Sequence, residues 1–95
     1  MNLEVTDKAV KWYENEYEIT EKTPMRLFVR YGGIGGLIPG FSLGLSIENP
    51  NDIHAEKTIN NITFYIEEQD AWYFEDKDLL IEFNHDLHEP KFIYE

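Results

Sequence analysis

Hydrophobic and polar residues change their spacing along this chain, from a helical repeat near the N-terminus to alternation further on. Along residues 6–18 and the residue before them, apolar side chains recur three and four positions apart, at Val5, Ala9, Trp12, Tyr13 and Tyr17. This is the spacing of one buried face of a helix. Thr6 is suited to cap the first turn, because its hydroxyl can accept a backbone N–H. The pattern therefore predicts a helix over residues 6–18.

After Pro24, apolar residues alternate with polar ones, which is typical of strands with one buried face. The predicted strands cover residues 25–31, 41–47, 62–66 and 79–83, with a short terminal strand at 92–94. Residues 67–74 are predicted to form a short helix or turn in which Trp72 covers the core. One helix packed on a mostly antiparallel, strand-rich sheet is an α+β fold. We expect residues 1–95 to form a single domain.

The composition narrows the class of partner. The 95 residues carry 19 acidic and 8 basic side chains, which gives a formal net charge of −11. Such a field repels nucleic-acid phosphates and anionic lipid, so we expect neither nucleic-acid nor membrane binding. A protein partner with a basic surface suits this charge, although solubility alone also explains it.

The chain contains no cysteine. This excludes disulfides and thiolate ligands, and together with an acidic N-terminus that lacks an apolar signal region it predicts a cytoplasmic protein. The sequence leaves open whether the chain is a monomer or a homodimer, because an exposed sheet edge can pair two copies.

All six glycines lie between residues 31 and 44, in the stretch "YGGIGGLIPGFSLG". This stretch leads into a predicted strand and lacks the Gly-Lys-Ser/Thr ending of phosphate-binding loops, so a nucleotide site is not expected. Its apolar side chains, Ile34, Leu37, Ile38 and Phe41, are expensive to leave in water. They are predicted either to fold under the sheet or to contact a protein partner.

Histidines and carboxylates gather in the stretch "FNHDLHEP" at residues 83–90. His85, Asp86, His88 and Glu89 form a possible ligand set for Zn²⁺ or Fe²⁺. The alternative is a solvated turn between two strands, because any histidine of an acidic protein lies near carboxylates.

Other polar residues do not indicate catalysis. Arg26 and Arg30 lie on one face of a predicted strand, where they can grip an anion or neutralise local acid. Ser42 and Ser46 point away from the apolar face of the next strand, without a neighbouring base or nucleophile motif. We therefore expect no enzyme activity and no catalytic residues.

Several segments together resemble a known family. The helix "VTDKAVKWYENEY", the strand "MRLFVRYGG", the glycine-rich loop and the strand "GFSLGLSIE" resemble the HesB/IscA-like fold of A-type iron–sulfur carriers. The stretch "ITFYIEEQDAWYFEDKDLLIEFN" is similar to the later strands and the connecting helix of that family. Within it, "FVRYGG" and "PGFSLG" are most similar to the YneR-like branch, and the likeness covers roughly residues 1–84.

The departures from this family concern its ligands. Members that carry clusters place one cysteine in the glycine loop and a Cys-Gly-Cys near the C-terminus. Here Ile34, Leu37 or Ile38 stands where the first thiol is expected, and the tail has no counterpart to Cys-Gly-Cys. The resemblance thus implies neither a cysteine-ligated iron–sulfur cluster nor another cofactor.

The sequence supports two functional hypotheses. The first is a non-catalytic binding or adaptor protein on a HesB-like fold, with a possible association with iron–sulfur cluster biogenesis through protein contacts. The second is a cysteine-independent metal-binding protein that uses His85, His88 and the nearby carboxylates.

Overall fold

The elements of the fold follow one another closely along the chain in the computed structural model, which describes residues 1–33 and 35–95. Their bounds are β1 Leu3–Val5, α1 Asp7–Glu16, β2 Thr23–Tyr31, β3 Phe41–Ile47, β4 Ile53–Ile59, β5 Ile62–Glu67, the 3₁₀ helix η1 Glu68–Phe74, β6 Leu79–Asn84 and β7 Glu89–Tyr94.

The N-terminal helix is where the apolar repeat predicts it. The Thr6 hydroxyl accepts a hydrogen bond from the backbone N–H of Ala9 at 3.4 Å, so Thr6 is the N-cap of α1. Ala9, Val10 and Tyr13 are buried on one side of the helix. The helix therefore packs through most of the stripe that the sequence indicated. Tyr17 is an exception, because the helix ends at Glu16 and this ring is 43% exposed.

The strands form two mixed sheets, in the orders β3-β2-β5-β4 and β1-β6-β7. In the first sheet, β2 pairs antiparallel with β3 and parallel with β5, and β4 pairs antiparallel with β5. In the second sheet, β6 pairs parallel with β1 and antiparallel with β7. The predicted α+β class, with a helix and a strand-rich sheet, is confirmed, and the strands divide between two sheets.

Two strands were not predicted from the sequence. β1 has only 3 residues, too few for alternation to stand out. β4 reads "IHAEKTI", and of its residues only Ala55 is buried. It is a strand because β5 supplies its hydrogen-bonding partner, from Ile53↔Glu67 to Ile59↔Ile62. Whether such a segment forms a strand depends more on pairing with a neighbouring strand than on its own side chains.

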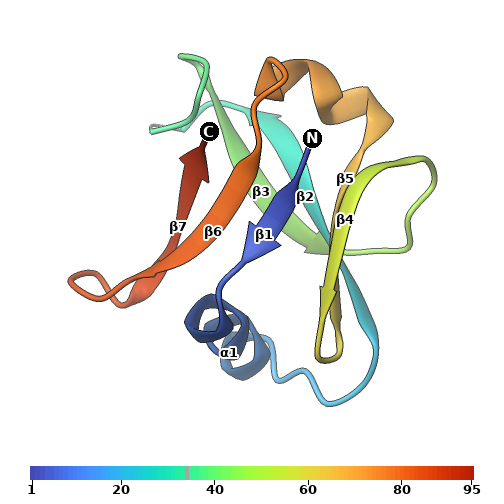
Figure 1. Cartoon of the computed structure of the whole chain (residues 1–95), viewed down its shortest axis with the longest axis vertical. Coiled ribbons are helices and arrows are strands. Elements are labelled where there is room, and N and C mark those ends of the chain that lie inside the picture. The colour runs from blue at the N-terminus through green and yellow to red at the C-terminus, as the bar shows by residue number, and fades with distance from the viewer. Residues whose placement is uncertain (34) are drawn as a thin grey trace.

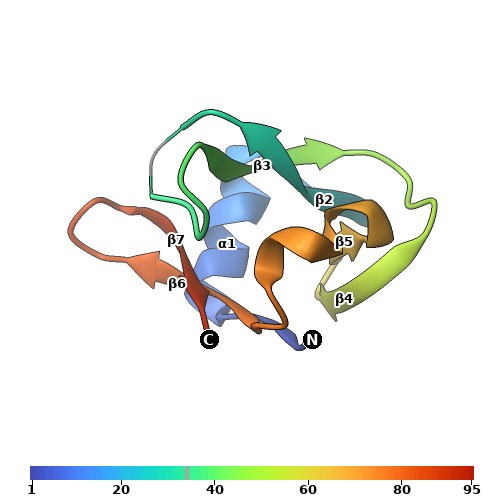
Figure 2. The same ribbon diagram turned by 90° about the horizontal axis from the view of Figure 1, so that it is seen from above.

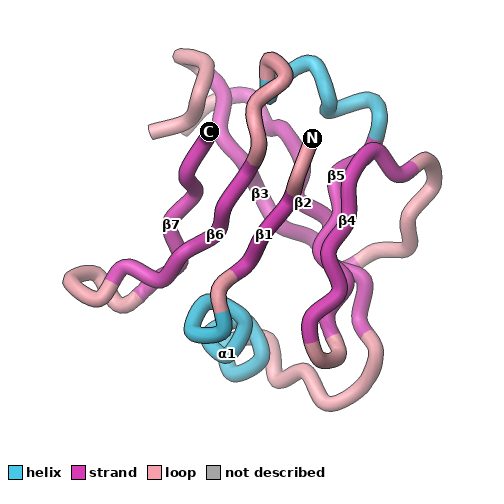
Figure 3. Tube along the Cα trace, in the orientation of Figure 1, coloured by secondary structure: helices cyan, strands magenta, loops and turns pink. Residues whose placement is uncertain are grey.

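The core lies between the two sheets, with α1 across one end and η1 across the other (Figure 1, Figure 2). Leu27 of β2, Phe64 of β5 and Ile81 of β6 are fully buried there. The tube in Figure 3 shows the glycine loop and η1 at the same end of the molecule, opposite α1. The fold thus brings two segments together that are about 30 positions apart in the sequence.

The predicted role of Trp72 in covering the core is wrong. Trp72 is 53% exposed, whereas its neighbours Tyr73 and Phe74 are buried. The short helix turns these two rings inward, so its third aromatic ring projects toward solvent. Within residues 1–33 and 35–95, no helix is long and apolar enough to cross a membrane.

Burial of Tyr13 leads to a prediction about alkaline stability. Burial, reinforced by the nearby Tyr17, raises the pKa of Tyr13 above its ordinary value of 10.0. The folded chain thus keeps this proton when the unfolded chain has lost it, so its contribution to stability is complete below about pH 10 and declines above it. One such group lowers the free energy of unfolding by about 1.4 kcal/mol per pH unit in that range.

The Tyr13→Phe variant is expected to lose stability less steeply above about pH 10, because phenylalanine has no proton to release. Urea unfolding at successive pH values measures this slope. Tyr31→Phe, which alters a ring that is 89% exposed, is the control and is expected to keep the wild-type slope. Equal slopes for wild type and Tyr13→Phe would contradict the prediction.

Candidate functional site

The glycine loop between β2 and β3 is closed by its own backbone. The N–H of Gly32 donates to the carbonyl of Gly40 at 2.7 Å, and the N–H of Phe41 donates to the carbonyl of Ile38 at 3.1 Å. Gly32 and Gly40 both have positive φ, at 103° and 88°, which favours glycine at the two ends of the loop. Ile34, predicted to contact a partner, lies outside the described residues.

The tip of the loop is fastened to η1. The N–H of Leu37 donates to the Tyr73 hydroxyl at 2.7 Å. A Cβ at Gly36 would lie 2.5 Å from the same hydroxyl and would also collide with the carbonyl of Phe41. Glycine is therefore required at position 36 for the loop to approach Tyr73 this closely.

The apolar residues of the loop both pack and remain partly exposed. Leu37, Ile38 and Phe41 are half-buried and lie against the hydrophobic core. These three side chains thus pack against the core with part of their surface. Their predicted contact with a protein partner stays a prediction.

Three aromatic rings form a cluster beside this loop, which we call the aromatic corner: Tyr31, Phe41 and Trp72. The rings of Tyr31 and Phe41 meet edge to face with centroids 5.7 Å apart, and those of Phe41 and Trp72 do so at 5.4 Å. Tyr31 is 89% and Trp72 53% exposed. Neither was predicted from the sequence as a site residue, although a tyrosine at a strand end beside paired glycines was a usable signal. The corner is a prearranged aromatic surface open to solvent.

Arg26 is the centre of a charge cluster on the outer side of the first sheet. Its guanidinium lies 2.9 Å from Asp70 of η1 and 3.2 Å from Glu48, which follows β3. Burial lowers the pKa of Arg26, but the hydrogen bonds that it donates to these two carboxylates, together with their negative charges, outweigh this effect and raise the pKa overall. Ser46, with Arg26, holds the pKa of Glu48 below its usual value. The prediction that Arg26 neutralises local acid is confirmed.

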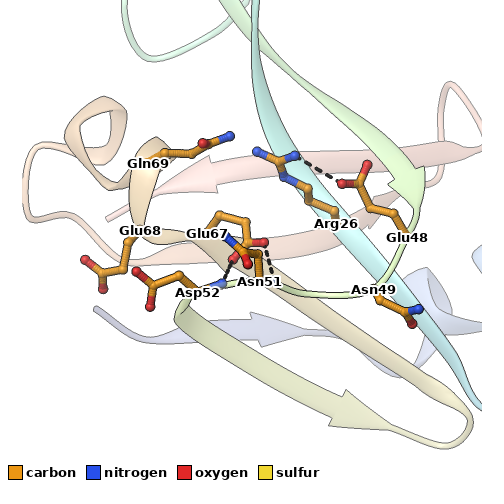
Figure 4. A pocket seen from close by; sticks show the side chains of 8 residues that line it. All are labelled: Arg26, Glu48, Asn49, Asn51, Asp52, Glu67, Glu68 and Gln69. Carbon is orange, nitrogen blue, oxygen red and sulfur yellow. Dashed lines mark hydrogen bonds and ion pairs between the residues drawn. The ribbon is translucent and has the colours of Figure 1, made fainter.

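The same cluster fixes the connection between β3 and β4. Figure 4 shows the Glu67 carboxylate, which accepts the backbone N–H groups of Asn51 and Asp52, each at 2.7 Å. The Tyr65 hydroxyl donates to the carbonyl of Glu48 at 2.6 Å. The hollow of about 340 Å³ beside these groups is lined in part by Arg26, Glu48 and Glu67, whose side chains already hold the chain in place. We interpret it as a structural clamp.

Arg30 and Ser42 form a separate hydrogen-bonded chain. Arg30 Nε donates to the Ser42 hydroxyl at 2.8 Å, and that hydroxyl donates to the carbonyl of Gly32 at 3.0 Å. Ser46 in turn donates to Glu48. Both serine hydroxyls thus serve to position neighbouring groups.

The predicted metal ligands lie at the β6–β7 turn. His85, Asp86, His88 and Glu89 are all exposed, and the ring of Phe83 contacts both histidines. In the part of the chain that the structure describes, no three histidine or carboxylate side chains converge as a metal-binding group. Metal binding here stays a prediction, and equilibrium dialysis with Zn²⁺ or Fe²⁺ against the His85→Ala/His88→Ala variant tests it.

The Tyr73→Phe variant is expected to release the tip of the glycine loop. It leaves the half-buried N–H of Leu37 without its acceptor, which costs about 1–3 kcal/mol and lowers the melting temperature by several degrees. Hydrogen exchange at the Leu37 amide is expected to become faster. Tyr94→Phe is the control, because it removes the neighbouring hydroxyl and keeps the Leu37 bond. Unchanged exchange in Tyr73→Phe would contradict this view of the loop.

Comparison with known proteins gives relatives of similar length. The chain is 39% identical over 95 residues to the pyruvate dehydrogenase inhibitor of Bacillus subtilis, covering 100% of both chains. It is 37% identical over 97 residues to an uncharacterised protein of Staphylococcus epidermidis, covering 99% of this chain and 97% of the relative. An uncharacterised protein of Staphylococcus haemolyticus is 36% identical over 85 residues, or 86% of each chain.

No family model and no solved structure matches the chain. The HesB resemblance and its association with iron–sulfur biogenesis therefore stay predictions, whereas the likeness to small YneR-like proteins agrees with these relatives. The full-length similarity places the chain in the family of small proteins to which the pyruvate dehydrogenase inhibitor of Bacillus subtilis belongs.

Proposed function

We propose that this protein is a non-catalytic inhibitor that binds a pyruvate dehydrogenase of its host through the aromatic corner. The observation that carries the proposal is the end-to-end similarity, at 39% identity, to a protein named for this inhibition. The alignment covers the whole of the Bacillus subtilis inhibitor, so every part of that protein has a counterpart in this chain.

Several of the polar side chains near the candidate site are bonded to one another, which supports a binding role. Arg26 is engaged by Asp70 and Glu48, and Ser42 by Arg30. His54 Nδ1 lies 2.7 Å from a carboxylate oxygen of Glu68. These groups hold segments of the chain together, which suits a rigid surface for recognition.

The aromatic corner has the chemistry of a protein interface. Tyrosine and tryptophan are enriched among the residues that dominate binding energy, and edge-to-face packing of Tyr31, Phe41 and Trp72 fixes the rings before a partner arrives. The half-buried Leu37 and Ile38 extend this surface along the glycine loop. Covering one large apolar side chain contributes about 1.5–3 kcal/mol.

The charge of the chain favours a basic partner surface. At a formal net charge of −11, the field accelerates the approach of a positively charged protein and slows that of an acidic one. Inhibition is therefore expected to weaken as ionic strength rises, because salt screens this attraction.

The test uses the purified pyruvate dehydrogenase complex of the host. Wild-type protein is expected to reduce its activity and to be captured by it, whereas Tyr31→Ala and Trp72→Ala are expected to weaken inhibition about tenfold or more, or about 1.4 kcal/mol of binding energy each. Because both side chains are largely exposed, folding stability is expected to change little.

Leu87→Ala is the matched control. Leu87 is 66% exposed in the β6–β7 turn, away from the corner, so its loss tests whether any exposed apolar residue has the same effect. The control is expected to inhibit like wild type. Absence of inhibition by the wild-type protein would refute the proposed function, and full inhibition by both corner variants would refute the role of the corner.

A further inference from the structure

The edge strands of the two sheets differ in how they are protected against pairing with another chain. These strands are β1 and β7 in one sheet and β3 and β4 in the other. An edge strand presents backbone N–H and C=O groups that another chain can pair with, and proteins block it with charge, proline, a bulge or short length. The edges can therefore be compared by these devices.

Three of the four edge strands carry such devices. β1 has only 3 residues. β4 contains His54, Glu56 and Lys57, and its pairing with β5 is irregular between Ile53 and Ala55. β7 contains Pro90 and Lys91.

β3 is different. Its 7 residues read "FSLGLSI", with no charge and no proline, and it pairs with β2 in unbroken register from Tyr31↔Phe41 to Met25↔Ile47. Among the described residues, β3 has extensive contacts with β2 alone, and residues 42–47 make no backbone hydrogen bond to any other element. The side of β3 away from β2 is thus an unblocked edge.

We propose that this edge of β3 receives an extended segment of the inhibited enzyme as an additional strand. The inference rests on the proposed function and specifies how the partner is held. β3 starts at Phe41, a member of the aromatic corner, so the edge and the corner form one continuous surface. A segment of about 7 residues, roughly 23 Å long, matches the strand.

The side chains of β3 indicate the character of that segment. On the core side, Leu43 and Leu45 offer apolar neighbours, whereas the outer side carries the small polar side chains of Ser42 and Ser46. Cross-strand packing then favours alternation of apolar and polar residues in the added strand. The aromatic ring of Phe28 lies over Gly44, where a Cβ would come within 2.6 Å of it, so glycine is required there for the ring to approach this closely.

The charge of the chain selects among possible occupants. Two copies of this protein each carry a formal net charge of −11 and repel one another, which disfavours pairing of β3 with itself. A segment whose polar positions carry lysine or arginine is attracted by the same field. The occupant is therefore a net-basic extended segment of the partner protein.

Hydrogen exchange, resolved by peptide, tests this inference on the wild-type protein with and without the pyruvate dehydrogenase complex. In the free protein, the amides of β3 that point away from β2 are expected to exchange rapidly. In the complex, exchange of these outward-pointing amides within residues 42–47 is expected to slow at least tenfold, because the added strand accepts their hydrogen bonds. β4 is expected to show no such change.

Two variants, each of which replaces a hydroxyl side chain of an edge strand by lysine, provide a second test. Ser46→Lys places a charge on the open edge, and Thr58→Lys places one on β4. Ser46→Lys is expected to weaken capture and inhibition about tenfold or more, whereas Thr58→Lys is expected to stay within about twofold of wild type. Thermal unfolding of both variants shows whether each remains folded.

The outcomes separate the inference from the proposed function. If the protein inhibits the enzyme but hydrogen exchange of the β3 amides does not slow in the complex, the added strand is overturned and the inhibitor role stands. No capture and no inhibition overturns both. If light scattering shows a homodimer of the wild-type protein and a monomer of Ser46→Lys, the β3 edge binds a second copy of this chain and the inference is overturned.

Discussion

The position of Tyr73 is the constraint on which the end of the molecule with the glycine loop and the aromatic corner depends. Its hydroxyl accepts the N–H of Leu37 and lies 3.4 Å from that of Tyr94, while its ring contacts Trp72 and Phe74 edge to face. Burial, with the neighbouring Tyr73 hydroxyl, raises the pKa of Tyr94. Through this one side chain the glycine loop, η1 and β7 become a single packed unit.

A second constraint operates on the other side of η1. Asp70 is buried against Arg26 of β2, while Glu48 joins the same arginine from the connection after β3. A buried carboxylate needs such a partner, because an unpaired charge is costly to remove from water. η1 is thus held by Tyr73, which faces the core and the glycine loop, and by Asp70, which faces Arg26. Trp72 is the ring of η1 that is directed to solvent.

These two constraints give the proposed interface its form. The rings of Tyr31 and Phe41 come from paired positions of β2 and β3, so the corner belongs to the sheet as much as to the loop. A partner that meets these rings also meets the start of the open β3 edge. A rigid surface of this kind loses little conformational entropy on binding, and this suits the proposed binding role of a chain of 95 residues.

The sequence by itself determined the elements whose pattern is internal to them. The helix capped by Thr6, the alternation of β3 and the absence of cysteine ligands needed no tertiary information. Only the tertiary structure decided that β4 is a strand and that the sheet divides in two, because strand pairing joins residues far apart in the chain. It also decided that Trp72 faces solvent and meets Phe41, since the direction of a side chain in a short helix depends on what packs against that helix.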